Sequence, residues 1–256
     1  MVYLKTDHEI NLMRASSLLV AKTHAELAKV IKPGINTLYL DQIAEEFIRD
    51  NGGIPAFKGY NGFPNTLCIS KDSEVVHGIP LDMEVEEGSI LSIDCGVLMN
   101  GFYGDSAYTF PVGKISIEKK KLLSVTKEAL NLGVLAAKCG NTVGDIGFAI
   151  QDFAESNGYS IVKELVGHGI GRKLHELPEI PNYGKKKSGV MLESGMVLAI
   201  EPMVNLGTAG VVQKSDGWTI ETCDGLPSAH FEYTIAITQD KTDILSSFSL
   251  VEDILK

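Results

Sequence analysis

Apolar side chains recur with helical spacing in three segments of the chain, and turn residues end each segment. The first begins at Thr6 and Glu9, whose spacing is that of a capping box, and continues to residues 33–34. The second follows Thr37 and ends at an Asn-Gly-Gly turn. The third, over residues 146–154, repeats the second with each apolar position displaced by 106 residues. The pattern therefore predicts three amphipathic helices.

Two apolar runs with the character of strands repeat with nearly the same displacement. Residues 87–94 align with residues 194–201 at an offset of 107, and a carboxylate ends each run. Chance similarity is the alternative, but the agreement of two offsets predicts a duplicated unit with halves at about 1–113 and 114–256. The length suits one domain spanning residues 1–256.

The dipeptide Asn100-Gly101 lies between two apolar runs and predicts a two-residue hairpin turn. In that register the numbers of paired residues sum to 201, so Asp94 faces Ala107. Asp105 then lies diagonally from Asp94 on the same face, roughly 7–8 Å away at the backbone. The two carboxylates are therefore expected to converge.

Two further acids, Glu201 and Glu232, adjoin apolar runs that are predicted to be buried strands. Buried carboxylates this close repel each other and lose hydration, and a divalent cation removes both penalties. For Asp94 and Asp105 alone, a polar sheet face in water is the alternative. Four carboxylates balance the charge of two divalent ions. An oxygen-rich set with one imidazole suits manganese, iron, cobalt or zinc and does not distinguish among them.

Three of the six histidines lie where the backbone is expected to turn or to approach a site closely. His168 and His175 belong to the glycine-rich run 167–176, and His77 ends an apolar run at a turn. Each of them, taken alone, also fits a hydrogen-bonded structural histidine. Their chemistry depends on whether the acids lie nearby.

The other histidines and the cysteines indicate no additional site. His24 falls on an apolar helical stripe and is expected in the core, whereas His8 and His230 are expected in solvent or in local hydrogen bonds. The four cysteines lie at least 27 residues apart without a C-x-x-C pair. We expect free and mostly buried thiols.

Composition and charge exclude several classes of partner. The chain has 44% hydrophobic and 22% charged residues, as soluble globular proteins have. A formal net charge of -10, with no basic run longer than three residues, argues against DNA or RNA. No apolar run reaches 18 residues and the N-terminus becomes polar early, so we expect a cytoplasmic protein without a membrane segment.

Motifs along nearly the whole chain resemble those of the type I methionine aminopeptidases, in the pita-bread metallopeptidase superfamily (M24-like). They are V-V-H-G-I-P at 75–80, S-I-D-C-G and G-D-S at 92–96 and 104–106, G-H-G-I-G-R-x-x-H-E at 167–176, A-I-E-P at 199–202, and F-E-Y-T-I at 231–235. The resemblance implies an α+β pita-bread fold, with two pseudo-symmetric helix/strand halves and a central curved, mainly antiparallel sheet covered by helices.

The same resemblance implies a metal-dependent hydrolase that removes N-terminal methionine from nascent polypeptides and favours a small second residue. The metal ligands would be Asp94, Asp105, His168, Glu201 and Glu232, with Asp105 and Glu232 bridging two divalent ions. A hydroxide between the ions would attack the first peptide carbonyl, with Glu201 as the proton shuttle. His175 would stabilise the oxyanion, and His77 would position the second residue.

Resemblance also implies an apolar slot for the methionine side chain, formed by Tyr60, Phe63, Cys68 and Trp218 beside the two catalytic histidines. Two positions depart from the family pattern. Phe57 stands where the family often has cysteine, and Leu174 where it often has phenylalanine. We expect these changes to reshape the slot without abolishing it.

Two rival functions stay open at this point. A proline-directed aminopeptidase or dipeptidase of the same fold would use similar ligands, but it usually carries an extra N-terminal domain, and here only about 60 residues precede the slot segment. A non-catalytic pita-bread binding protein would lack ligands that this chain retains. A type II methionine aminopeptidase is disfavoured because the 32 residues between His168 and Glu201 leave no room for its helical insertion. The expected state is a monomer, with transient ribosome contact as a further expectation.

Overall fold

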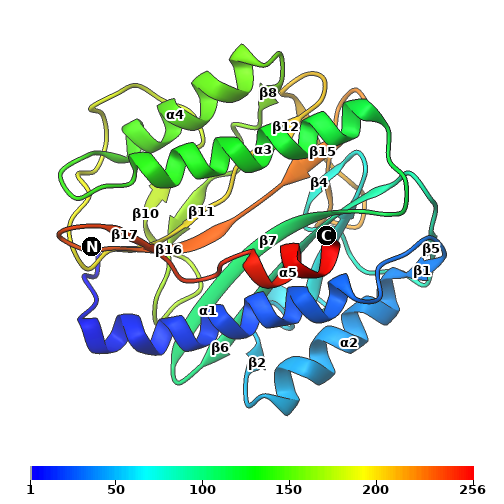
Figure 1. Cartoon of the computed structure of the whole chain (residues 1–256), viewed down its shortest axis with the longest axis horizontal. Coiled ribbons are helices and arrows are strands. Elements are labelled where there is room, and N and C mark those ends of the chain that lie inside the picture. Colours follow the sequence, from blue (N-terminus) through cyan, green and yellow to red (C-terminus); the bar gives the residue numbers. More distant parts are fainter. Residues whose placement is uncertain (1) are drawn as a thin grey trace.

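A computed structural model describes residues 2–256 as an α+β architecture of helices and antiparallel sheets (Figure 1). The helices are α1 (Asp7–Ala28), α2 (Thr37–Asp50), the 3-10 turn η1 (Tyr60–Gly62), α3 (Ile117–Ala136), α4 (Val143–Ser156) and α5 (Ser249–Leu255). The strands of the first half are β1 (Ile35–Asn36), β2 (Ile54–Pro55), β3 (Leu67–Lys71), β4 (Glu74–Val76), β5 (Glu84–Val85), β6 (Ile90–Met99) and β7 (Phe102–Pro111).

The later strands are shorter and more numerous. They are β8 (Ser160–Ile161), β9 (Gly167–Gly169), β10 (Glu176–Ile180), β11 (Val197–Ile200), β12 (Met203–Asn205), β13 (Val211–Gln213), β14 (Ile220–Thr222), β15 (Ser228–His230), β16 (Tyr233–Ile237) and β17 (Thr242–Ile244). Two groups of strands position the site: β10-β9-β11-β16-β17, and β2-β6-β3 with β7 paired to β6. Every strand pairing within residues 2–256 is antiparallel.

The three predicted helices are confirmed as α1, α2 and α4. Thr6 and Glu9 form the predicted capping box of α1. The cap of α2 is Asn36, whose side chain accepts from two backbone N–H groups, so Thr37 is the first helical residue. Both ends of α4 lie 106 residues after those of α2, which is the spacing of the sequence repeat. Helix α3 has no counterpart among the predicted helices, although Ser116 caps it.

The hairpin of β6 and β7 has the predicted register. Asp94 pairs with Ala107, and Gly96 pairs with Asp105. Asn100 and Gly101 both have positive φ, as the two-residue turn requires. The local sequence therefore determines how the first two acids are placed relative to each other.

Strand β7 joins the first half of the chain to β15 and β16 of the second half. The Thr234 hydroxyl donates to the Asp105 carbonyl at 2.7 Å, and the Ser106 hydroxyl donates to the Glu232 carbonyl at 2.6 Å. The Glu232 N–H donates to the Ala107 carbonyl at 2.9 Å. These bonds hold Asp105 and Glu232 side by side although they are far apart in sequence.

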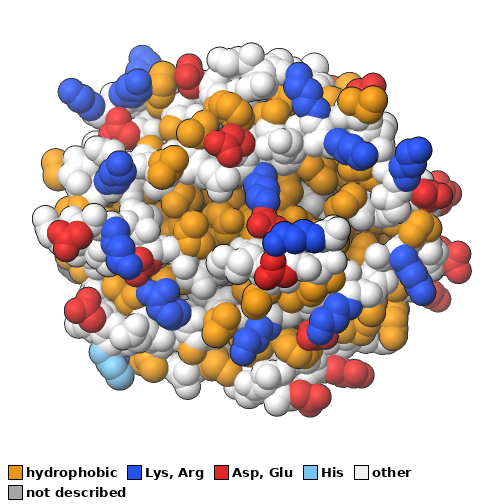
Figure 2. Space-filling view, in the orientation of Figure 1, with side chains coloured by type: hydrophobic (Ala, Val, Ile, Leu, Met, Phe, Trp, Pro, Cys, Tyr) orange, Lys and Arg blue, Asp and Glu red, His pale blue; other side chains and the backbone are white. Residues whose placement is uncertain are grey.

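Helices cover the two halves of the strand system (Figure 1). Helix α1 packs against β6 and β7, whereas α3 and α4 pack together and contact the strands of the second half. On the face that the helices form, acidic and basic side chains are interspersed with apolar ones (Figure 2). Within residues 2–256, none of the helices combines the length and apolar character needed to cross a membrane.

The cysteine prediction is only half right. Cys68 and Cys95 are buried, but Cys139 is partly exposed and Cys223 is exposed. All four are free thiols, as expected. His24 lies in the core as predicted, with 1% of its surface exposed.

Candidate metal centre and substrate cleft

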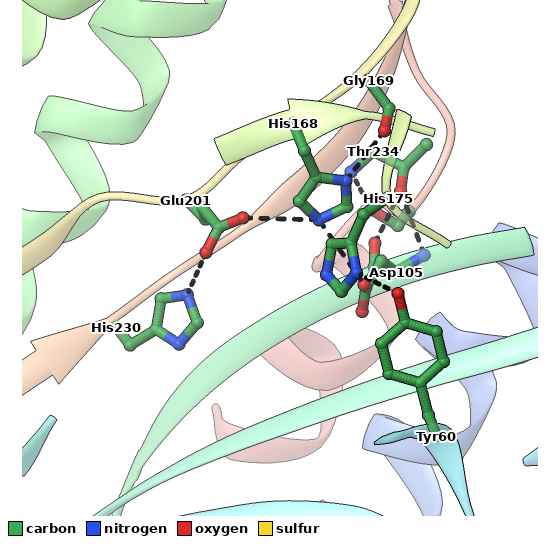
Figure 3. Close-up of polar contacts among 9 residues, drawn as sticks. Tyr60, Asp105, His168, Gly169, His175, Glu201, His230 and Thr234 are labelled. Carbon is green, nitrogen blue, oxygen red and sulfur yellow. Dashed lines mark hydrogen bonds and ion pairs between the residues drawn. The ribbon is translucent and has the colours of Figure 1, made fainter. Parts of the chain in front are cut away.

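The five predicted metal ligands line one cavity of about 180 Å³. They are Asp94 on β6, Asp105 on β7, His168 on β9, Glu201 directly after β11 and Glu232 directly before β16. Ligand atoms of Asp105, His168 and Glu232 lie within 4.8 Å of one another, which is close enough to bind one ion. The His168 Nε2 lies 3.5 Å from the Glu201 Oε1 and 4.0 Å from the Asp105 Oδ2 (Figure 3).

Two glycines hold His168 in place by allowing close contact with neighbouring strands. A Cβ on Gly167 would lie 2.4 Å from the Ala199 carbonyl oxygen, and one on Gly169 would lie 2.3 Å from the Leu177 carbonyl oxygen. Any larger residue would force the strands apart. The glycines of this motif therefore serve the packing of β9 between β10 and β11, which directs His168 into the cavity.

The acids occupy an environment that disfavours their ionised forms. Burial raises the pKa of Asp94 to about 7. The pKa values of Asp105 and Glu232 are raised well above their ordinary values, first by burial and then by neighbouring carboxylates. The pKa of Glu201 is raised in the same way, by burial and by Asp94. Without a compensating cation, these groups resist ionisation at neutral pH.

The hydrogen-bonding capacity of the site also indicates a cation. Within residues 2–256, Oδ1 of Asp94, Oδ1 of Asp105 and Oε1 of Glu232 are buried without a hydrogen-bond partner. The His168 Nδ1 lies 2.9 Å from the Gly169 carbonyl oxygen and must donate to it, which leaves a lone pair on Nε2 facing the acids. Burial lowers the pKa of His168 to about 4, so the ring is neutral. Acceptors that face one another in this way fit divalent metal ions.

The two other predicted catalytic histidines border the same space. His77 and His175 both line the 180 Å³ cavity, and burial lowers the pKa of each. His77 has φ of +59°, a conformation that is uncommon for residues other than glycine and that clusters at functional sites. The rings of His168 and His175 meet edge to face at 4.4 Å between centroids. The Nδ1 of His175 lies 2.8 Å from the Tyr60 hydroxyl.

The four predicted slot residues and both departures from the family pattern line the apolar side of this cavity. They are Phe57, Tyr60, Phe63, Cys68, Leu174 and Trp218. The Phe63 and Trp218 rings pack edge to face at 5.2 Å. The cavity is smaller than the roughly 300–1,000 Å³ typical of pockets for drug-sized ligands. Its size suits a single amino-acid side chain.

A wider cleft of about 520 Å³ continues from the acids towards solvent. Val76, Leu165 and Met203 supply apolar lining, and Glu164 and Glu179 lie at its exposed part. It shares five lining residues with the smaller cavity: His77, Asp94, His168, His175 and Glu201. One end of a ligand can therefore enter the slot while the remainder extends along the cleft.

The expectation for His230 as a solvent or locally bonded group is wrong. This residue is only 1% exposed, and it lines the cleft with its Nε2 3.9 Å from the Glu201 Oε2. Burial lowers the pKa of His230 to about 3. The signal that the sequence offered was its closeness to Glu232, which follows two residues later. His8, by contrast, is exposed as expected.

Comparison with known proteins places this geometry in a family. Residues 11–239 match metallopeptidase family M24. The chain is 52% identical over 246 residues to methionine aminopeptidase 1 of Bacillus subtilis strain 168, with 96% of this chain and 99% of that protein covered. The crystal structure of a Thermotoga maritima methionine aminopeptidase superposes with a TM-score of 0.95 at 44% identity, covering 96% of this chain and all of that one.

A more distant structure shares the fold alone. The prolidase of Pyrococcus furiosus superposes with a TM-score of 0.77 at 24% identity, and the match covers 95% of this chain but 65% of the prolidase. The expected α+β pita-bread architecture is thereby confirmed. The chain belongs to metallopeptidase family M24 and, within it, to the type I methionine aminopeptidases.

Proposed function

We propose that this protein removes the N-terminal methionine from newly made polypeptides whose second residue is small. The observation that carries the proposal is a single cavity. On one side of it lie buried carboxylate oxygens that have no hydrogen-bond partner within residues 2–256, together with the lone pair of His168 Nε2, and on the other side lies the apolar slot. Sequence identity of 52% to a methionine aminopeptidase over nearly the whole chain supports the same activity.

In this proposal, Asp94, Asp105, His168, Glu201 and Glu232 hold two divalent ions, which are manganese, iron, cobalt or zinc. When bound, such ions act as Lewis acids on the scissile carbonyl and lower the pKa of water. Their charge offsets the mutual repulsion of the acids, so all four carboxylates ionise at neutral pH.

The protein groups then perform the binding and proton-transfer steps. The apolar slot holds the methionine side chain, and the rest of the peptide extends along the wider cleft. Glu201 accepts the proton of the attacking water and returns it to the leaving amine. His175 donates an N–H to the carbonyl oxygen as it becomes negative, and His77 positions the amide of the second residue.

Other features of the proposal concern the cellular setting. The substrates are N-terminal methionine peptides of nascent chains, and the enzyme meets them in the cytoplasm. We propose a monomer that makes transient contact with the ribosome and acts as a single catalytic domain over residues 1–256. The net charge of -10 argues against DNA as a partner.

Hydrolysis of Met-Ala-Ser and Ala-Pro-Ser in the presence of each candidate ion tests the proposal. We expect rapid release of methionine from the first peptide, its loss with EDTA, and its recovery when the ion is restored. Faster cleavage of Ala-Pro-Ser would instead identify a proline-directed enzyme. A fully metal-loaded protein that cleaves neither peptide would indicate a binding protein.

A further inference from the structure

Tyr60 lines the apolar slot, and it also makes a polar contact that this role does not require. Its hydroxyl lies 2.8 Å from the Nδ1 of His175, which is 115 positions away in sequence (Figure 3). The phenol points out of the tight turn η1 and towards the imidazole, so the ring of Tyr60 borders the slot while its oxygen reaches a histidine. A phenylalanine would supply the same apolar surface without this contact.

The turn that carries Tyr60 is closed by its own backbone. Gly59 has φ of +84°, and its N–H donates to the Phe63 carbonyl at 2.8 Å. The Tyr60 N–H donates to the Phe57 carbonyl at 2.9 Å, and the Phe63 N–H returns to the Tyr60 carbonyl at 2.9 Å. These three bonds limit the movement of Tyr60. The backbone of Tyr60 is therefore restrained, and the contact with His175 places its hydroxyl.

The direction of this hydrogen bond determines the tautomer of His175. A neutral imidazole has one donor nitrogen and one acceptor nitrogen, and the Tyr60 hydroxyl contacts Nδ1. Burial raises the pKa of Tyr60, so the phenol keeps its proton. Within residues 2–256, His175 Nδ1 is the only hydrogen-bond acceptor that the Tyr60 hydroxyl meets. A phenol that donates to Nδ1 leaves the imidazole proton on Nε2.

The two ring nitrogens are separated by Cε1 and their outward directions diverge, so Nε2 points away from Tyr60 when Nδ1 points towards it. We propose that Tyr60 is a positioning residue that holds His175 as its Nε2–H tautomer, with that N–H available to the reacting carbonyl oxygen. This inference rests on the role of His175 in the proposed function. In the opposite tautomer, Nε2 would present its lone pair to the carbonyl oxygen. The lone pair would repel this oxygen as it becomes negative.

Tyr60→Phe is a close test because it removes one oxygen and keeps the ring. With Met-Ala-Ser as substrate, we expect kcat to fall about tenfold while KM changes by less than twofold, since the hydroxyl acts in the transition state. In a His175→Ala background, the same change should have no further effect on kcat. Tyr183→Phe removes a phenol outside the cavity and should retain wild-type kinetics.

Long-range ¹H–¹⁵N spectra of the protein loaded with diamagnetic Zn²⁺ report the tautomer independently of activity. The signals of His175 are those that disappear in His175→Ala. In the wild type we expect these signals to show a protonated Nε2 and an acceptor-type Nδ1. In Tyr60→Phe we expect a mixture of the two tautomers. A protonated Nδ1 in the wild type would overturn the proposal, as would a Tyr60→Phe effect confined to KM. If the wild type fails to cleave Met-Ala-Ser, the proposed function fails, and the spectra still decide the tautomer.

Discussion

Lys5 and Glu176 form an ion pair between the N-terminal segment and the segment that carries His175. The Lys5 Nζ lies 2.7 Å from the Glu176 Oε2, and each side chain is 6% exposed. The other carboxylate oxygen accepts from the Lys173 N–H at 3.1 Å. A Cβ on Gly171 would lie 2.6 Å from the Lys5 Cε, so the loop approaches the pair closely. The two chain segments are thus joined beside the wider cleft, which Glu176 lines.

Removing one member of this pair should destabilise the protein. Lys5→Met leaves the buried Glu176 charge uncompensated, and we expect the free energy of unfolding in urea to fall by about 3–5 kcal/mol. Lys5→Met combined with Glu176→Leu should recover most of that loss, because both charges are then absent. The exposed pair of Lys256 and Asp253 offers a control, since Lys256→Met should have little effect. Equal losses in the two single variants would show that burial does not matter.

Glu201→Gln should abolish most turnover while the fold survives. The amide neither accepts the proton of the attacking water nor supplies the negative charge of the carboxylate, so we expect kcat to fall about 10²- to 10⁴-fold. Rates with Met-Ala-Ser, together with circular dichroism, separate chemistry from unfolding. Glu193→Gln is the matched change at an exposed position and should leave the rate unaltered. Wild-type turnover in Glu201→Gln would refute the assigned proton shuttle.

Metal binding should stabilise the folded protein because it relieves the crowding of the acids. At 100 times its dissociation constant, Mn²⁺ should add about 2.7 kcal/mol to the free energy of unfolding of the wild type. Asp105→Asn should lose this gain in a thermal melt. The same variant should be at least as stable as the wild type without metal at pH 7. The metal-free fold must keep Asp105 protonated at a pH where the unfolded chain ionises it, whereas asparagine is uncharged in both states. Asp152→Asn, which is exposed on α4, should respond to Mn²⁺ as the wild type does. An unchanged Mn²⁺ response in Asp105→Asn would exclude this residue as a ligand.

His24 should make stability depend on pH in the acidic range. Burial lowers the pKa of His24 to about 4, and its Nε2–H donates to the Ser106 carbonyl at 2.9 Å. Above pH 6.5 both the folded and unfolded states hold the neutral ring, so its stabilisation is complete. Below that value the unfolded chain binds the proton first, and stability falls by roughly 1 kcal/mol per pH unit down to about pH 4.

The variant His24→Gln keeps an N–H donor for Ser106 but does not titrate. Urea unfolding of both proteins in EDTA between pH 4 and pH 7 isolates the His24 contribution, because the other titrating groups are common to both. The stability advantage of the wild type over the variant should shrink as the pH is lowered. A pH-independent difference would mean that His24 has the same pKa in the folded and unfolded protein, and a growing advantage at low pH would mean that the folded protein holds it protonated.

Local rules of the sequence determined the helices with clear caps and the hairpin that sets Asp94 against Ala107. In each case a few neighbouring residues restrict the backbone, as Asn100 and Gly101 do at the turn. The sequence pattern also singled out the four acids and His168 that line the cavity, and their roles as ligands stay predictions.

Tertiary structure alone decided which distant segments meet. Contacts between β7 and β16 bring Asp105 to Glu232, the turn at Tyr60 reaches His175, and His230 is buried facing Glu201. No local propensity encodes such contacts, since they depend on the packing of whole strands and on the closure of long loops. The sequence by itself therefore determined the chemical groups, and the packing of the two halves determined their arrangement.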